Sequence, residues 1–266
     1  MFGLFKKKRH LYDRLEFLKE QYQNIPNLIL SFPRCGRTWV RYLLGHYIAK
    51  KYNVDFIVLH DRPRPGIPRI LFRHDFMSAA GRISWEKFFQ IQDSKQFIFK
   101  EEMKEQNIIY LFRNPLDVLF SYWSYLQRIP YENFVAPKHG DIIDFAKNKQ
   151  WGFDIIINFM NTQLDHFKQH KNSKLLVKYE DLKKQDTEWQ KLIEFIFGDF
   201  NEKSFAYAKE QTTFKKMQEK NDAEDSELVK SLIQSNKDVP DVLKFFRKGG
   251  SNYINDLPKD QQDILL

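Results

Sequence analysis

Residues 28–39 read LILSFPRCGRTW. An apolar, β-prone run at 28–32 is followed by a short turn and then by a helical pattern that extends to about Lys51. In a parallel α/β sheet, ligands bind beyond the carboxyl end of a strand, which is where this turn lies. Free N–H groups at the helix start, with Arg34, Gly36, Arg37 and Thr38, suit an anion. The stretch predicts an anion site, with a plain strand-to-helix turn as the alternative.

Further β-prone runs alternate with helical patterns along the chain. The runs cover residues 56–59, 70–72, 108–112 and 175–178. Helices are expected at 115–125, 153–170, 201–211 and 225–235, with a polar spacer at 215–224 and a further helix capped by Asp181. This alternation predicts an α/β fold with a central, mostly parallel sheet flanked by helices. We expect a single domain over residues 25–266, preceded by a basic N-terminal arm and lead-in helix over residues 1–24.

The balance of charge leaves three kinds of partner open. In 266 residues, 43 Lys and Arg exceed 35 Asp and Glu, for a net charge of +8. Such an excess suits nucleic acid, a membrane surface or a small polyanion. The segment Met1–Arg9 could touch anionic lipid, although a solvated tail is the simpler interpretation. With one cysteine and no apolar run of membrane-spanning length, we expect a cytoplasmic protein without a disulfide or Cys-based zinc cluster.

A second informative stretch, residues 109–122, reads IYLFRNPLDVLFSY. Arg113 ends a predicted strand and Ser121 follows within the next helix, so both could reach a ligand lying across the edge of the sheet. Neither this stretch nor residues 28–39 matches the Walker pattern G-x-x-x-x-G-K-[ST]. A nucleotide-dependent kinase therefore stays an alternative, although neither stretch carries this phosphate-binding pattern. A basic nucleic-acid-binding protein is the alternative from another class.

Both stretches resemble the nucleotide-binding elements of the cytosolic sulfotransferase family. That family transfers sulfonate from 3′-phosphoadenosine 5′-phosphosulfate (PAPS). Three more stretches resemble family motifs in the same order: KYEDL at 178–182, QTTFKKM at 211–217 and FRKGG at 246–250. Five ordered matches spread over nearly the whole chain make coincidence a poor explanation. The resemblance implies PAPS as co-substrate, adenosine 3′,5′-bisphosphate (PAP) as product, and no metal.

Roles for individual residues follow from this resemblance. The 5′-phosphosulfate and the adjacent adenine side would be held by Arg34, Cys35, Gly36, Arg37, Thr38 and Trp39. The 3′-phosphate would be held by Arg113, Ser121, Arg247, Lys248 and Gly249. The adenine pocket would be lined by Tyr179, Thr212 and Phe214. Arginine offers phosphate a planar fork of donors, and aromatic faces suit a purine, so the chemistry agrees with these assignments.

Residues 68–75, PRILFRHD, resemble the segment in which the family's catalytic histidine follows a short strand. His74 is thus expected to be the base that takes the acceptor proton, and Arg34 to stabilise the charge on the leaving phosphate. Phe72 departs from the family, which has a lysine there that acts on the bridging oxygen or the sulfonate. Arg34 or Arg73 is expected to supply that charge instead. A sulfotransferase-like binder without activity is a further alternative.

Other features leave alternatives open. The position of Cys35 near a helix N-terminus could lower its thiol pKa, whereas a lone cysteine more often packs as a small apolar residue. The acceptor is a small-molecule or glycan hydroxyl. Residues 61–68 and 128–140 could wall its pocket, where basic side chains suit an acidic glycan or lipid head group and aromatic ones suit a phenol or sterol. A carbohydrate or other polar hydroxyl is slightly favoured, with no nucleic-acid partner and the oligomeric state open.

Overall fold

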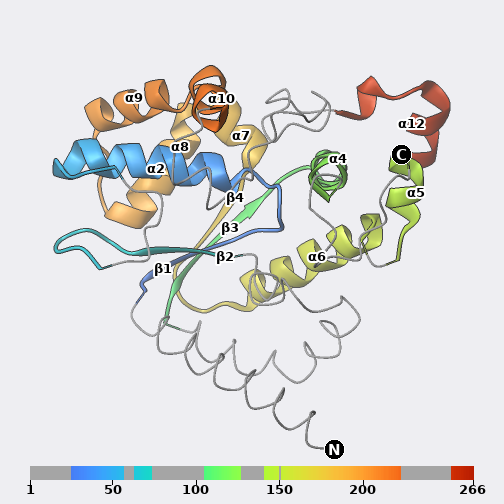
Figure 1. Cartoon of the computed structure of the whole chain (residues 1–266). Helices are drawn as coiled ribbons and strands as arrows, with labels where there is room; N and C mark the ends of the chain where they lie inside the picture. The colour runs from blue at the N-terminus through green and yellow to red at the C-terminus, as the bar shows by residue number, and fades with distance from the viewer. Residues whose placement is uncertain (1–24, 57–62, 74–104, 127–140, 150, 223–252) are drawn as a thin grey trace, which may run out of the picture.

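The structure, a computed structural model, describes residues 25–56, 63–73, 105–126, 141–149, 151–222 and 253–266 (Figure 1). Four strands form one sheet in the order β2-β1-β3-β4. Their bounds are β1 Asn27–Leu30, β2 Ile70–Arg73, β3 Asn107–Phe112 and β4 Lys174–Lys178. Each neighbouring pair is parallel, so the predicted α/β class with a mostly parallel sheet is confirmed.

Strand β1 is buried along its whole length because helices lie on both faces of the sheet. Leu28 and Leu30 pack on the side of α6, Phe153–Gln169. Ile29 belongs instead to the larger apolar cluster, which includes residues of α2, Arg37–Tyr52. A strand covered on both faces requires a continuous apolar run, which explains why this segment is recognisable in the sequence.

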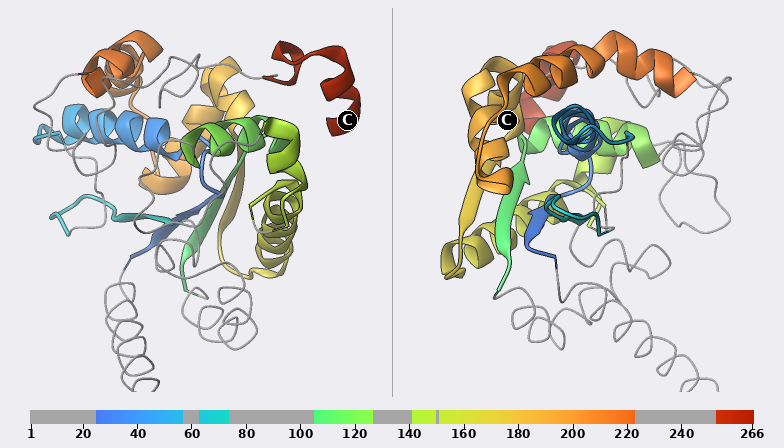
Figure 2. Two further views of the ribbon diagram at one scale, coloured as in Figure 1. Left: turned by 45° about the vertical axis from the view of Figure 1, so that its right-hand side comes forward. Right: turned by 90° about the vertical axis from the view of Figure 1, so that its left-hand side faces the viewer.

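The remaining helices complete the two layers. Their bounds are α4 Pro115–Leu126, α5 Ile142–Lys147, α7 Tyr179–Lys184, α8 Asp186–Phe197, α9 Glu202–Gln211, α10 Phe214–Asp222, the 3₁₀ helix η3 Tyr253–Asp256, and α12 Lys259–Leu265. Helix α9 packs along α2 (Figure 2). Helix α4 packs against α5, α6 and η3. Within the described ranges, no helix is both long enough and apolar enough to cross a bilayer.

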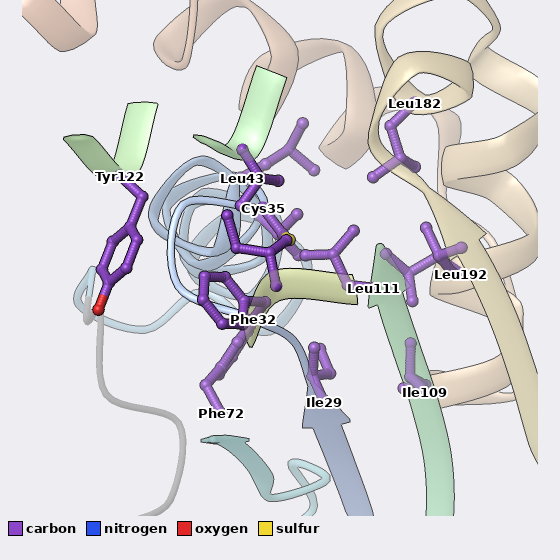
Figure 3. Packing of buried hydrophobic residues seen from close by; sticks show 14 of the residues in the cluster. Ile29, Phe32, Cys35, Leu43, Phe72, Ile109, Leu111, Tyr122, Leu182 and Leu192 are labelled. Atoms are coloured by element: carbon purple, nitrogen blue, oxygen red, sulfur yellow. The ribbon is translucent and has the colours of Figure 1, made fainter. Parts of the chain in front are cut away.

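Phe32 fixes the chain at the point where it leaves β1. Its side chain is fully buried and meets Tyr122 and Phe159 edge to face, with ring centroids 5.3 and 5.2 Å away. Figure 3 shows Phe32 beside Cys35, Leu43 and Phe72 in the same cluster. Edge-to-face pairs each add about 0.5–1.5 kcal/mol to the burial of the rings. The turn after β1 is therefore held by α4 and α6 as well as by the sheet.

Two predicted boundaries are wrong for local reasons. The first strand ends at Leu30 rather than Phe32, because the chain turns toward Arg34, whose backbone is left-handed with φ 74°. Asp181 does not cap a helix but lies inside α7, and α8 begins only after Gln185. Acidic residues also favour the first turn of a helix, where they face the positive end of its dipole, so this signal marked the wrong position.

The predicted polar spacer at 215–224 is also wrong over most of its length, because α10 occupies Phe214–Asp222. Lysine, glutamine and glutamate are good helix formers, and the buried Met217 supplies an apolar contact. Phe56 lies outside a strand, with its ring 4.1 Å from that of His46. The rest of the run predicted at 56–59 and the helix predicted at 225–235 lie outside the described residues.

Candidate active site

The turn between β1 and α2 carries two left-handed residues. Arg34 has φ 74° and Gly36, the N-cap of α2, has φ 91°. A left-handed backbone costs a residue with a side chain about 1–2 kcal/mol, so Arg34 must be held by its surroundings. Gly36 offers no side-chain cap, and the first turn of α2 contains no acidic residue. The first N–H groups of α2 therefore lie next to the turn, at the positive end of the helix dipole. Neither the N-cap residue nor the first turn of the helix supplies a carboxylate that could accept from them.

Arg113 and Ser121 hold Arg34 from its two ends. The buried Arg113 guanidinium donates to the Arg34 carbonyl at 3.2 Å, and the Arg34 Nε donates to the Ser121 Oγ at 3.1 Å. The Arg34 guanidinium also lies 5.1 Å from the centre of the Tyr125 ring. Since Arg113 follows β3 and Ser121 lies in α4, the structure brings the two predicted anion segments together around Arg34.

Tyr179 closes the other side of the turn. Its ring lies under the Arg113 guanidinium at 4.7 Å, within the range of a cation–π contact. A Cβ atom added to Gly36 would lie only 2.3 Å from the Tyr179 Cδ2 atom. The site therefore requires glycine at position 36 for two reasons, the positive φ and the approach of this ring.

Arg37 lies half-buried in the first turn of α2, next to the half-buried Thr38. Burial lowers the pKa of Arg37 well below its ordinary value, and repulsion from Arg41 lowers it further. Among the described residues, no carboxylate forms an ion pair with Arg37 and no oxygen accepts a hydrogen bond from it. A guanidinium stays protonated in proteins, so this cost is present as electrostatic strain. A bound anion would relieve it.

An aromatic wall stands beside the turn. Trp39 meets Tyr179 and Trp189 edge to face, with ring centroids 5.7 and 5.0 Å away. The Trp39 Nε1 donates to the Thr212 carbonyl at 3.2 Å, which ties α2 to the end of α9. The Thr212 hydroxyl donates to the Ala208 carbonyl at 2.8 Å. Thr212 thus orients Trp39 through its backbone, and Phe214, 39% exposed, begins α10 close to it in sequence.

Cys35 belongs to the hydrophobic core and not to the solvent-facing side of the turn (Figure 3). Its side chain is fully buried, and burial raises the pKa of the thiol to about 12. The nearby positive charge of Arg113 lowers this pKa, but by less than desolvation raises it. Complete burial therefore favours the packing role over the alternative of a lowered thiol pKa.

Three polar residues of the site were not singled out from the sequence. Arg41 lies one helical turn beyond Arg37, a spacing that places both on one face of α2. Asp117 is buried in α4 and accepts from the Tyr253 N–H at 3.0 Å, and Glu180 accepts from the Asn114 N–H at 3.0 Å. Glu180 is adjacent to Tyr179 in the KYEDL stretch, a signal that could have revealed it. Asp117 lies in the stretch at 109–122, but its partner Tyr253 is distant in sequence and is not visible there.

Four predicted residues, His74, Arg247, Lys248 and Gly249, lie outside the described residues. Arg73, directly before His74, ends β2, and Leu30 pairs with Arg73 in the parallel register. The chain therefore enters the His74 segment at the same edge of the sheet as the turn after β1. Tyr253, which follows the FRKGG stretch, has its ring 5.7 Å from the Arg113 guanidinium.

Comparison with known proteins shows which family shares this sequence and fold. A sequence model described as "Sulfotransferase domain" matches residues 25–265. The solved structure of mouse sulfotransferase SULT7A1 complexed with PAP is similar with a TM-score of 0.52 and 20% identity, covering 90% of this chain and 80% of that one. Retinol dehydratase, solved with androsterone and inactive cofactor PAP, is similar with a TM-score of 0.54 and 14% identity, covering 93% and 82%. Comparison with curated protein sequences gave no match.

At these identities the two structures establish the fold, whereas the sequence model extends over nearly the whole chain. The fold agrees with the motifs at 28–39 and 109–122, whose residues meet at one edge of the sheet. The chain therefore belongs to the sulfotransferase domain family, the PAPS-dependent sulfotransferases that its motifs resemble.

Proposed function

We propose that the protein transfers sulfonate from PAPS to the hydroxyl of a small-molecule or glycan acceptor and releases PAP. The observation that carries this proposal is the joining of Arg34, Arg113 and Ser121 beside an uncapped helix N-terminus. Such a site offers guanidinium and backbone donors to phosphate oxygens. Both solved relatives contain PAP, which supports an adenosine bisphosphate as the ligand here.

The residues present fit such a nucleotide. On the 5′ side we assign Arg34, Gly36, Arg37, Thr38 and Trp39, with Cys35 contributing its backbone N–H. On the 3′-phosphate we assign Arg113, Ser121, Arg247, Lys248 and Gly249. Around adenine we assign Tyr179, Thr212 and Phe214. The electrostatic strain on Arg37 and the close approach of Tyr179 to Gly36 support a cradle built for an anion.

The donor supplies an activated sulfonate, and the protein must remove a proton from the acceptor hydroxyl. His74 is the proposed base because an imidazole titrates near neutral pH and because β2 delivers its segment to the edge of the sheet that carries the turn. Arg34 is the proposed cation for charge that develops on the leaving phosphate. The proposed acceptor is a carbohydrate or another polar alcohol. A panel that includes a steroid tests this assignment, because one relative was solved with androsterone.

Replacing Arg113 should weaken the binding of PAP. Charge-assisted hydrogen bonds contribute about 1.5–3 kcal/mol, so Arg113→Ala is expected to raise the Kd for PAP at least about tenfold in calorimetric titration. Ser121→Ala should also raise the Kd for PAP, although it removes only a hydroxyl group and leaves the buried cation in place. Lys174→Ala, at the opposite end of the sheet, is the control and should leave binding unchanged. Unchanged PAP affinity in both folded site variants would rule out the proposed 3′-phosphate pocket.

Adding a methyl group at Gly36 should damage the site more than the same change at another left-handed glycine. Gly198 has φ 78° but no atom within 4 Å of an added Cβ, so Gly198→Ala measures the backbone cost alone. Gly36→Ala must also displace the Tyr179 ring. We expect Gly36→Ala to lower the free energy of unfolding further in urea titration and to weaken PAP binding at least about tenfold. Equal effects of the two substitutions on PAP binding would contradict this geometry.

His74→Ala should abolish transfer while leaving nucleotide binding intact. A general base contributes about 10²–10⁴-fold, so transfer of radiolabelled sulfonate is expected to fall by at least about 10²-fold. The Kd for PAP should stay within about twofold of wild type, a change of less than 0.5 kcal/mol. His170→Ala is a matched control, because the His170 Nε2 atom contacts the Gln106 carbonyl away from the site. Retained transfer by His74→Ala would reject His74 as the base.

A further inference from the structure

Arg41 places a cation at the end of β2, where the side chain of Phe72 provides none. The Arg41 guanidinium donates to the Phe72 carbonyl at 3.3 Å and lies 4.7 Å from the centre of the Phe72 ring. Arg41 is half-buried on α2, whereas Phe72 is buried in the core. The ring and the carbonyl together fix the guanidinium beside the strand that leads to the His74 segment.

Arg41 also lies close enough to Arg37 to disfavour its charge. The two are one helical turn apart, and repulsion from Arg41 contributes to the lowered pKa of Arg37. Like charges at this spacing destabilise an isolated helix by about 0.2–0.5 kcal/mol, and partial burial strengthens the effect. Two arginines one helical turn apart near the start of α2 therefore form a local concentration of positive charge that suits an anion.

Of the two arginines that the sequence suggested for this charge, Arg34 contacts α4 and Arg73 is buried within β2. Arg34 donates through Nε to Ser121 and lies over the Tyr125 ring, both on α4. Arg73 is buried within β2, 4% exposed, and its carbonyl accepts from the Ser31 N–H at 3.2 Å. Arg41 is the arginine that reaches the end of β2 from the helix whose N-terminus forms the anion site.

We propose that Arg41 is a catalytic residue that contacts the sulfonate group of the donor and stabilises its charge during transfer. The inference rests on the proposed use of PAPS. In the transfer, the acceptor oxygen forms a bond to sulfur while the bond between sulfur and the 5′-phosphate oxygen breaks. The electron pair of the broken bond leaves with PAP, and the acceptor proton goes to the base. A guanidinium held beside the sulfonate oxygens offsets their charge through these changes without proton transfer of its own.

PAPS carries the sulfonate group and PAP does not. Comparing the affinities for the two nucleotides therefore isolates the proposed contact between Arg41 and the sulfonate. In calorimetric titration without acceptor, Arg41→Gln should bind PAP within about twofold of wild type but bind PAPS at least about tenfold more weakly, as expected when one charge-assisted contact is lost. The rate of sulfonate transfer at saturating PAPS should fall by about 10²-fold, as when one donor to a developing oxyanion is removed. Arg41→Lys should recover part of the PAPS affinity and of the rate, because it keeps the charge without the planar fork.

Lys50→Gln removes a cation from the exposed far end of the same helix and should behave as wild type in every measurement. Thermal unfolding of all variants separates a folding defect from a site defect. If Arg41→Gln unfolds, the comparison is made on Arg41→Lys, which should still bind PAPS more weakly than wild type and PAP equally well. Equal losses of PAP and PAPS affinity, or wild-type transfer by a folded Arg41 variant, would overturn the role of Arg41 alone. Failure of the wild-type protein to bind PAP would overturn the proposed function and this inference with it.

Discussion

The hydrogen bond from the Arg113 guanidinium to the Arg34 carbonyl is the contact on which the rest of the site depends. It joins the end of β3 to the turn after β1 and holds Arg34 in a left-handed conformation that a residue with a side chain adopts at a cost. The same guanidinium covers Tyr179, whose ring in turn leaves room only for glycine at position 36. The ends of β1 and β3 and the starts of α2 and α7 therefore meet around one buried cation.

A buried cation is costly to desolvate, and aromatic rings and carbonyl oxygens offset part of that cost. Arg113 has contacts of both kinds, and Arg41 has the same combination at Phe72. Rings and carbonyl oxygens carry no formal negative charge, so these contacts position the two guanidiniums without being ion pairs themselves. The cations are thus fixed in advance by packing, and binding need not pay the full cost of ordering flexible side chains.

Sequence predicted those parts of the fold that depend on local patterns. The alternation of apolar runs and helical patterns predicted the parallel α/β sheet, and the order of motifs identified the turn at 33–36 and the pair Arg113 and Ser121. Helix ends were less predictable, because Asp181 suits both a cap and a first turn. The role of Cys35 stayed open in the sequence because a helix N-terminus is visible there, whereas complete burial, which raises the thiol pKa, is a property of the packed core.

Arg41 shows why part of the site required the structure. In the sequence it is one of 43 basic residues, and its spacing from Arg37 is equally compatible with a solvated helix face. Its contact with Phe72 depends on how α2 crosses β2, which no local pattern encodes. Asp117 is similar, since its partner is the backbone of Tyr253 in a segment far along the chain.

The central claim is that this cluster of cations recognises an adenosine nucleotide carrying a 3′-phosphate. Calorimetric titration of the wild-type protein with PAP and with ATP in the presence of Mg²⁺ tests it most directly. The account predicts that PAP binds at least about tenfold more tightly, although ATP carries a longer phosphate chain, because ATP lacks the 3′-phosphate that Arg113 and Ser121 are proposed to hold. Equal or tighter binding of ATP would contradict the account and favour a nucleotide-dependent kinase.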